Sequence, residues 1–293
     1  MTKLKSIIVV FSVICIMILS GCSYEPEKIT DLELHFIDVG QGDSTFIITP
    51  DGYSMLIDAG DNTKGDTVVN YIKSMGIDKI DVLIGTHPDA DHIGGLDDGI
   101  NSFEIGDCYM PKKMHTTKTF EDVLTAAKDK GLKIKSAVSD KEIAFDPKTK
   151  AIFLSPEDRK YSDNNAYSAV VKLSYGKNTF LLTGDAEKEN DADMLDKYGE
   201  ALNCDVIKLA HHGSSTSNTE QFLDQVSPDV AIISCGYKNK YSHPHKEVLT
   251  YLKEKDIPVY RTDEQGDIVV YSDGENLQVN QENTGSYEYR KGN

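Results

Sequence analysis

The chain has 293 residues, of which 48 are acidic and 31 are basic, and its formal net charge is −17. This acidic balance excludes a surface that binds nucleic acid over a wide area, because phosphate contacts depend on lysine and arginine side chains that displace counterions. A local site where bound cations reverse the field stays compatible with it. The length is enough for one large two-sheet domain or for two small ones.

The N-terminus predicts a lipoprotein signal peptide over residues 1–21. Two lysines precede an apolar run over residues 7–19, which is shorter than the about 20 residues that a membrane-spanning helix needs. A Ser-Gly pair directly before Cys22 resembles the lipobox of bacterial lipoproteins, in which the cysteine is acylated and becomes the new N-terminus. Cleavage there leaves 29 basic against 48 acidic residues, a formal charge of −19. An uncleaved N-terminal anchor is the alternative, and either would place the rest of the chain outside the cytoplasm.

Residues 22–31 are polar and contain a proline, which predicts a tether before the folded part. Apolar runs then predict strands at 32–38, 44–48, 54–58, 82–86, 108–110, 151–154, 169–175, 179–183, 206–210, 230–234, 259–261 and 268–272. Helical periodicity predicts helices at 67–75, 119–130, 188–197, 219–225 and 246–255. Strand, strand and helix recur roughly in the two halves, which favours two sheets packed face to face with helices outside. We expect one α/β domain over 32–275 and a polar tail over 276–293.

The strongest chemical signal is the segment THPDADHIGG, which follows an apolar strand. Its potential metal ligands are His87, Asp89, Asp91 and His92. A strand that ends in a turn can aim alternate side chains at one point, and the start of a helix can supply the adjacent Asp and His. Imidazole and carboxylate together suit Zn²⁺, Mn²⁺ or Fe, and the absence of thiolate argues against a purely structural zinc site. A solvated acidic loop with two incidental histidines is the alternative.

These residues resemble the HxHxDH motif of the metallo-β-lactamase superfamily, with Asp89 in place of the second histidine. The HxDxDH form is similar to the extracellular hydrolase-like domain of the DNA-uptake channel protein ComEC and to its stand-alone relatives. Further agreement lies in segments 36–44, 56–60, 181–185, 208–214 and 242–245. The resemblance spans residues 32–272 and implies a four-layer αββα sandwich.

The resemblance also implies a site for two cations. It makes His87 and Asp89 ligands of the first ion and Asp91 and His92 ligands of the second. Asp185 corresponds to the carboxylate that bridges both ions, since its two oxygens can bind different cations. On its own, the Thr-Gly-Asp tripeptide would fit a helix N-cap equally well.

The pair His211-His212 closes an apolar strand where this family places its last metal ligand. Adjacent side chains on a strand point to opposite faces, so we expect one to bind metal and the other to face the substrate, unless the strand has already ended before them. We favour His211 as the ligand. Where many family members have a further histidine, this chain offers Asn165 or Ser168. An amide oxygen suits a harder ion than Zn²⁺, so the first site is expected to be weak, selective for Mn²⁺ or empty.

Several other polar residues are expected to support the site. Asp38, Asp43 and Asp58 would accept N–H groups of ligating histidines and fix their tautomers, Asp58 in particular. Glycines 40 and 42 would form a tight turn that aims Gln41 or Asp43 into the cleft. The backbone N–H groups at Gly213 and Ser214 would lie close to a phosphate or a developing oxyanion. His243 would hold a substrate oxygen or protonate a leaving group, with an exposed turn histidine as the alternative.

Together these assignments predict a lipid-anchored hydrolase on the extracytoplasmic face of the cell membrane. One or two divalent ions, Zn²⁺ or Mn²⁺, would supply hydroxide by lowering the pKa of bound water. Asp91 or Asp89 would accept its second proton, and His212 or His243 would assist the leaving group. The favoured substrate is a phosphodiester, with DNA among the candidates, because ComEC-like relatives are associated with degrading one strand of incoming DNA. The alternatives are a cell-wall phosphocholine ester, a lactone, thioester or β-lactam, and a non-catalytic binding module. The oligomeric state stays open.

Overall fold

The computed structural model describes residues 29–283 and 287–292. The predicted signal peptide, Cys22 and most of the predicted tether lie outside the described residues. Within the described ranges, no helix has both the length and the apolar character that crossing a membrane requires.

The first sheet has eight strands in the order β15-β14-β1-β2-β3-β4-β5-β6. Strands β14, β1, β2 and β3 pair antiparallel, and β3 to β6 pair parallel. Their bounds are β1 Leu32–Phe36, β2 Thr45–Ile48, β3 Ser54–Ile57, β4 Lys79–Ile84, β5 Glu104–Met110, β6 Ile134–Ser136, β14 Ile268–Ser272 and β15 Leu277–Val279.

The second sheet repeats this plan with seven strands in the order β13-β12-β11-β10-β9-β8-β7. Strands β7 to β10 pair antiparallel and β10 to β13 pair parallel. Their bounds are β7 Glu142–Ile143, β8 Thr149–Ser155, β9 Val170–Tyr175, β10 Asn178–Leu182, β11 Val206–Lys208, β12 Val230–Ile233 and β13 Val259–Arg261.

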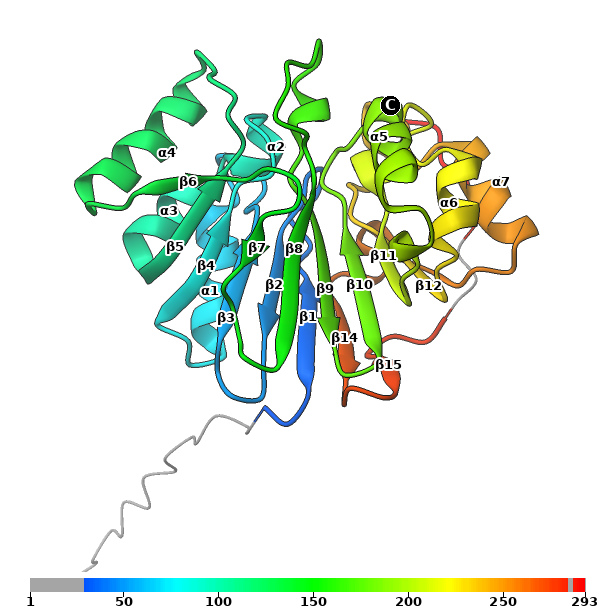
Figure 1. Cartoon of the computed structure of the whole chain (residues 1–293), viewed down its shortest axis with the longest axis horizontal. Helices are drawn as coiled ribbons and strands as arrows, with labels where there is room; N and C mark the ends of the chain where they lie inside the picture. Colours follow the sequence, from blue (N-terminus) through cyan, green and yellow to red (C-terminus); the bar gives the residue numbers. More distant parts are fainter. Residues whose placement is uncertain (1–28, 284–286, 293) are drawn as a thin grey trace, which may run out of the picture.

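Helices cover the outer face of each sheet (Figure 1). Helices α1 to α4 belong to the first half, and α5 to α8 belong to the second. Their bounds are α1 Gly65–Ser74, α2 Ala90–Ile93, α3 Leu96–Ser102, α4 Lys118–Asp129, α5 Lys188–Tyr198, α6 Glu220–Val226, α7 Lys246–Glu254 and α8 Thr262–Gln265. The predicted αββα sandwich of the α/β class is therefore confirmed.

Three apolar clusters account for this layering. Alternate side chains of the strands point to opposite faces, so each sheet contributes to two clusters. Phe36 and Phe180 lie in the cluster between the sheets. Leu56 and Val68 belong to the cluster under α1, α3 and α4, and Ile207 and Leu249 to the one under α5, α6 and α7. Burial on both sheet faces explains why the strands read as nearly continuous apolar runs.

The sheets differ from the sequence prediction at their edges and in the short elements. The two-residue strand β7, the edge strand β6 and the helices α2, α3 and α8 were not predicted, because short or polar segments carry little periodicity. Strand β15 pairs with β14 and lies inside the segment 276–293 that the sequence assigned to a polar tail. Its three residues, LQV, are too few to establish an alternating pattern.

Removing a buried ring between the sheets tests this packing. Phe180 is fully buried, so Phe180→Ala leaves a cavity and should lower the free energy of unfolding by about 3–5 kcal/mol. Urea denaturation measures the change. Tyr53→Ala is the matched control, since Tyr53 is exposed before β3, and its effect should stay within about 0.5 kcal/mol. Equal effects of the two substitutions would contradict a core in this place.

Candidate metal centre

The polar residues of the site gather where strands of both sheets end. Segments that follow β1, β3 and β4 meet segments that follow β10, β11 and β12. Two backbone contacts join the first three: Asp43 N–H donates to Asp91 O at 3.1 Å, and Ala59 N–H donates to His92 O at 2.8 Å. Gly42, with φ of +142°, permits the approach, because a Cβ there would lie 2.3 Å from Asp91 O. The tight turn predicted at this place is therefore required by close packing.

The orientation of the His92 ring is fixed by Asp58. Its Nδ1 lies 2.7 Å from Asp58 Oδ2, and the ring is completely buried. Asp58 also accepts the backbone N–H of Thr86 at 2.8 Å and its hydroxyl at 2.6 Å. Donation from Nδ1 leaves the Nε2 lone pair of a neutral ring facing away from Asp58, toward the centre. Asp58 thus lies in the supporting position that the sequence predicted for it.

His87 lies beside His92, with ring centroids 4.2 Å apart. Its Nδ1 is 3.1 Å from Thr86 Oγ1 and 3.4 Å from Ser168 Oγ. Burial and the nearby charge of His92 lower the pKa of His87 to about 3. The ring is therefore neutral at pH 7 and keeps a lone pair available.

The chain turns sharply at His211 and His212. Strand β11 ends at Lys208, and His211 and His212 have φ of +49° and +54°, while Gly213 has φ of +78°. Such left-handed conformations of non-glycine residues cost roughly 1–3 kcal/mol each and are concentrated at functional sites. Because the strand has already ended, both rings turn toward the same carboxylate: His212 Nε2 is 3.5 Å and His211 Nε2 is 3.8 Å from Asp185 Oδ2.

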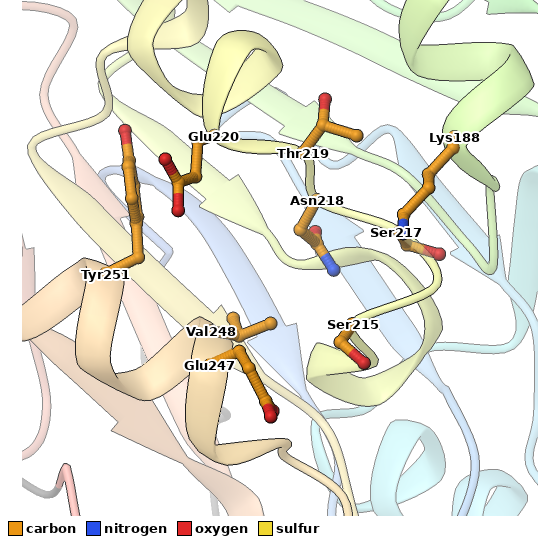
Figure 2. Close-up of a pocket in the computed structure, with 9 residues that line it drawn as sticks. All are labelled: Lys188, Ser215, Ser217, Asn218, Thr219, Glu220, Glu247, Val248 and Tyr251. Carbon is orange, nitrogen blue, oxygen red and sulfur yellow. The ribbon is translucent and has the colours of Figure 1, made fainter.

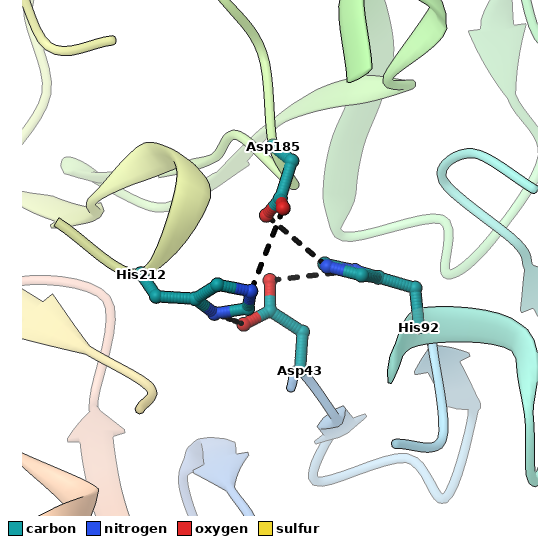
Figure 3. A group of neighbouring side chains, drawn as sticks. All are labelled: Asp43, His92, Asp185 and His212. Atoms are coloured by element: carbon teal, nitrogen blue, oxygen red, sulfur yellow. Dashed lines mark ion pairs between the residues drawn. The ribbon is translucent and has the colours of Figure 1, made fainter. Parts of the chain in front are cut away.

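The carboxylate of Asp185 faces the rings of His92 and His212 from the side opposite Asp43 (Figure 3). His92 Nε2 is 3.1 Å from Asp185 Oδ1, and His212 Nε2 is 3.4 Å from Asp91 Oδ2. The Nε2 atoms of His87, His92 and His212, and Asp185 Oδ1, have no partner in hydrogen-bonding geometry, although His92 and His212 form ion pairs with Asp185. Leaving several buried polar atoms unpaired costs free energy that one shared cation would offset.

Asp43 occupies the opposite edge of the two imidazoles. Its Oδ1 is 3.3 Å from His212 Nδ1 and its Oδ2 is 3.8 Å from His92 Nδ1. Oδ2 also forms an ion pair with the buried ammonium of Lys208. The ligand atoms of Asp43, His92, Asp185 and His212 all lie within 4.8 Å of one another. Because Asp185 faces Nε2 and Asp43 faces Nδ1, we interpret Asp43 as a support for the rings.

Charges within the cluster stabilise one another. Burial opposes the charged form of His92, but the carboxylates of Asp185 and Asp43 raise its pKa well above 6.5. Burial also opposes the charge of His212, and the same carboxylates raise its pKa to about 10. Burial alone would raise the pKa of Asp185, yet both imidazoles hold it well below its usual range. Two ring protons thus neutralise the carboxylates at the place where a cation would.

The residues present fit a divalent metal. Imidazole nitrogens and carboxylate oxygens converge without thiolate, which is the ligand chemistry of Zn²⁺, Mn²⁺ and Fe sites. Their other ring nitrogens are anchored: His212 Nδ1 is 2.9 Å from Ser234 O and His211 Nδ1 is 2.8 Å from Glu187 Oε1. Anchoring of this kind is typical of metal-binding histidines.

The structure also places the remaining predicted ligands near the centre. Asp89 Oδ2 is 3.8 Å from His87 Nε2, and Asp89 Oδ1 accepts from the Asn164 side chain at 3.0 Å. Ser168 contacts the Nδ1 edge of His87 and accepts the Asp185 N–H at 3.0 Å. Asn165 Nδ2 lies 3.3 Å from Glu187 Oε1 and faces the His211 side of the site. Neither Asn165 nor Ser168 presents an oxygen beside His87 Nε2, the position expected for a substitute ligand.

Three supporting residues differ from the prediction. Asp38 is exposed and accepts the N–H of Gly40 at 2.9 Å, so it stabilises the turn and lies outside the cluster. Gln41 Oε1 accepts the N–H of Gly236 at 3.1 Å, which joins that turn to the segment after β12. The N–H of Ser214 donates to His211 O at 2.8 Å, so it cannot also bind an oxyanion.

His243 lies among the site histidines. Its ring centroid is 5.2 Å from that of His211 and 5.9 Å from that of His212. Burial and the charge of His212 lower the pKa of His243 to about 3, and its buried Nδ1 has no hydrogen-bond partner. The ring is therefore neutral at pH 7, placed to accept a hydrogen bond or a proton, whereas the exposed turn histidine considered as an alternative does not describe it.

The sequence analysis missed three residues that hold the site together: Lys208, Glu187 and Asn164. Lys208 had a visible signal, since it is the one charged residue in the apolar run 206–210 and such lysines are buried only with a partner. Glu187 and Asn164 lie in polar loops, where the sequence offers no comparable contrast.

A pocket of about 460 Å³ opens beside the His211–Gly213 turn (Figure 2). It lies between the segment that follows this turn and the first residues of α5, α6 and α7. Its lining residues are Lys188, Ser215, Ser217, Asn218, Thr219, Glu220, Glu247, Val248 and Tyr251. None of the side chains of Asp43, His92, Asp185 and His212 lines this pocket, so the pocket lies beside the metal centre and does not form part of it.

Residues 37–237 match the profile of the Metallo-beta-lactamase superfamily. The match contains the segments that follow β1, β3, β4, β10 and β11. The chain belongs to the metallo-β-lactamase superfamily, as the two sheets and the histidine-carboxylate cluster indicate.

Relatives within this superfamily include competence proteins. The chain is 33% identical over 258 residues to ComE operon protein 3 of Bacillus subtilis (strain 168), which covers 80% of this chain and 32% of that protein. It is 30% identical over 255 residues to Competence protein ComA of Neisseria gonorrhoeae, which covers 86% and 34%. The chain thus spans about a third of the length of these relatives. It is a superfamily hydrolase related to competence proteins, and the predicted ComEC-like resemblance is confirmed.

Solved structures share the fold. CmlA, a diiron β-hydroxylase from Streptomyces venezuelae, superposes with a TM-score of 0.53 at 12% identity, covering 80% of this chain and 53% of that one. At this level of identity the likeness shows the fold alone.

The position of the two neighbouring histidines predicts unequal effects on metal binding. Because His212 Nε2 faces both Asp91 and Asp185, His212→Ala should lower metal affinity by roughly 100-fold or more. His211→Ala should lower it less, since its ring is partly exposed and anchored to Glu187. Metal titration followed by isothermal calorimetry measures both. A larger loss in His211→Ala would favour His211 as the ligand, as the sequence analysis did.

Asp58 should affect the metal indirectly, because it holds His92 and, through Thr86, His87. Asp58→Asn removes the acceptor that orients His92 and should weaken metal binding roughly 10- to 100-fold. The same calorimetric titration measures it. Asp273→Asn, in the exposed turn after β14, is the matched control and should bind metal as the wild type does. Unchanged affinity in Asp58→Asn would show that the contact has no role in binding.

Proposed function

We propose that this protein is a metal-dependent phosphodiesterase that acts on nucleic acid outside the cytoplasmic membrane. The observation that supports it best is the buried group formed by Asp43, His92, Asp185 and His212, whose ligand atoms all lie within 4.8 Å of one another. The relationship to competence proteins favours a nucleic acid over other phosphodiesters. We propose Zn²⁺ or Mn²⁺ as the bound ion, one or two in number.

When bound, such cations lower the pKa of a water molecule and neutralise charge on a phosphoryl oxygen. The chain's own groups then divide the remaining work. Asp91, held below its usual pKa by His212 although burial opposes this, stays a carboxylate and can accept a proton. Burial raises the pKa of Asp89, which makes it the better proton acceptor of the two.

His243 lies beside His212, with ring centroids 5.9 Å apart, so we propose that it faces the leaving group. His243 is neutral at pH 7 and has an unpaired Nδ1, so it can hold a substrate hydroxyl or phosphate proton. His212 was the other candidate for this role, but its Nε2 faces Asp91 and Asp185 in the metal position and its Nδ1 lies 2.9 Å from Ser234 O, so it keeps no free N–H once metal is bound. We therefore assign the contact with the leaving group to His243.

Hydrolysis of a β-lactam, lactone or thioester is the second candidate, and the superfamily membership is what favours it. Against it stands the position beside His87 Nε2, which Asp89 occupies at 3.8 Å, whereas the nearby His115 contacts the Asn164 amide, 3.2 Å from its Nε2. A carboxylate-rich site suits a harder ion and a phosphoryl oxygen better. Phosphocholine esters also present a phosphoryl oxygen to the metal. A binding measurement is therefore needed to distinguish them from nucleic acid as substrates.

Asp185 provides the central test. Asp185→Asn should lower kcat/KM for bis-(p-nitrophenyl) phosphate by roughly 1,000-fold, because several kcal/mol of charge stabilisation depend on bound metal. Nitrocefin should be a poor substrate for the wild type. Asp196→Asn, exposed on α5, should retain full activity. If the purified protein holds no transition metal and Asp185→Asn retains its activity, the enzyme proposal fails.

Anchoring is proposed from the N-terminal sequence. Acylation at Cys22 would attach the protein to the outer face of the membrane. In cells, the protein should then sediment with membranes and incorporate labelled palmitate, whereas Cys22→Ser should do neither. Cys204→Ser, at a buried cysteine of the fold, controls for loss of a thiol. Palmitate labelling that persists in Cys22→Ser would contradict the assignment.

A further inference from the structure

An aromatic and basic loop borders the metal centre. It comprises residues 237–243, after β12, in which two tyrosines alternate with lysines. Tyr237 is 61% and Tyr241 is 49% exposed. Lys238 and Lys240 are exposed too, and neither forms a salt bridge with any residue of the described ranges. In a strongly acidic chain, this loop is therefore a local source of uncompensated positive charge.

The loop is rigid although its tip is exposed. Asn239 is buried and bonds to the backbone on both sides of it. Its Nδ2 donates to Gly236 O at 2.9 Å and to His243 O at 2.6 Å, and its Oδ1 accepts from Tyr241 N at 3.1 Å and from His243 N at 3.0 Å. Rigid presentation of side chains lowers the entropy cost of binding.

The aromatic rings of the loop extend as far as the histidines of the metal centre. Tyr241 stacks on His243 with centroids 5.6 Å apart and an interplanar angle of 22°, and His243 neighbours His212. Lys240 Nζ lies 4.8 Å from the Tyr241 ring centroid, and Lys238 Nζ lies 5.4 Å from that of Tyr237. Both ammonium groups lie over ring faces, as does Arg290 Cζ at 5.3 Å from the Tyr237 centroid. Exposed rings accompanied by the cations of long side chains thus extend from the metal centre to solvent.

The composition of this surface favours one kind of ligand. Among the described residues five large apolar or aromatic side chains are exposed, and the loop supplies two of them, both tyrosines; Tyr289 lies close by, lining a pocket with His245. Aliphatic residues, which insertion into a lipid surface would require, are absent from this group of three. Unstacked bases pack on aromatic rings, and lysines beside the rings neutralise phosphates.

We infer that residues 237–243 bind single-stranded nucleic acid, with bases on Tyr237 and Tyr241 and phosphates beside Lys238 and Lys240. The loop would position a phosphodiester next to the metal centre, a step that rests on the proposed function. Double-stranded nucleic acid fits less well, since its bases already stack on one another.

Binding is measured by fluorescence anisotropy with the metal-loaded protein and a hydrolysis-resistant phosphorothioate deoxythymidine decamer. An abasic decamer of the same charge separates base stacking from charge. The wild type should bind the thymidine decamer roughly tenfold or more tightly than the abasic one. Tyr237→Ala with Lys238→Ala should remove that difference, and Tyr237→Phe should keep it, because the ring remains.

Tyr53→Ala with Lys148→Ala is the matched control pair. Tyr53 lies in the hairpin between β2 and β3, at the ends of those strands away from the site, and this pair should bind as the wild type does. Equal affinity of the wild type for both decamers, equal weakening by the control pair, or tighter binding of a duplex would overturn the inference.

Turnover of bis-(p-nitrophenyl) phosphate, which has no bases, is measured in parallel. If the wild type hydrolyses bis-(p-nitrophenyl) phosphate but the loop substitutions do not change binding, the inference about the loop is wrong and the phosphodiesterase proposal is unaffected. Loop-dependent binding without turnover would support the inference and refute the phosphodiesterase.

Discussion

The structure depends on gathering like charges in a dry place. Asp43, Asp58, Asp91 and Asp185 lie within a few side-chain lengths of one another, and burial alone would make their joint ionisation prohibitive. Lys208 and the protons of His92 and His212 supply three positive charges against these four carboxylates. A bound cation would add the positive charge that these carboxylates favour. The rest of the architecture is the framework that holds the carboxylates close together.

That framework comes from the repeated sheet plan. The ends of strands from two sheets meet at one edge, so side chains far apart in sequence converge without long loops. The cost is concentrated in a few backbone positions, of which Asp58, His211 and His212 have positive φ. A well-packed core on both sides of each sheet can hold such strained residues in place.

The sequence predicted the long elements and the ligand-bearing segments well. Buried strands and amphipathic helices have strong periodicity, and THPDADH is unusual enough to stand out. It could not predict how the ends of the strands turn. Assigning roles to His211 and His212 required knowing that β11 ends at Lys208, and a rule for strands does not apply past that point. The short helices α2 and α3 were missed because their few residues follow no apolar pattern.

Contacts between polar side chains were the least predictable. Ser168 and Asn165 were expected to offer a ligand oxygen, yet they contact the Nδ1 edge of one ring and the carboxylate behind another. Such details depend on rotations of a few degrees. Lys208 is the instructive exception, since a lone charge inside an apolar strand already implies a buried partner.

Strand β1 runs from the N-terminal end of the fold toward the metal centre, which is built from residues that follow it (Figure 1). The first residues of the domain and the centre therefore lie at opposite poles of the molecule. A protein held to a bilayer through its N-terminus would have its reactive edge directed outward, toward polymers arriving from the surroundings. Such an orientation would keep the headgroups of the supporting membrane out of reach.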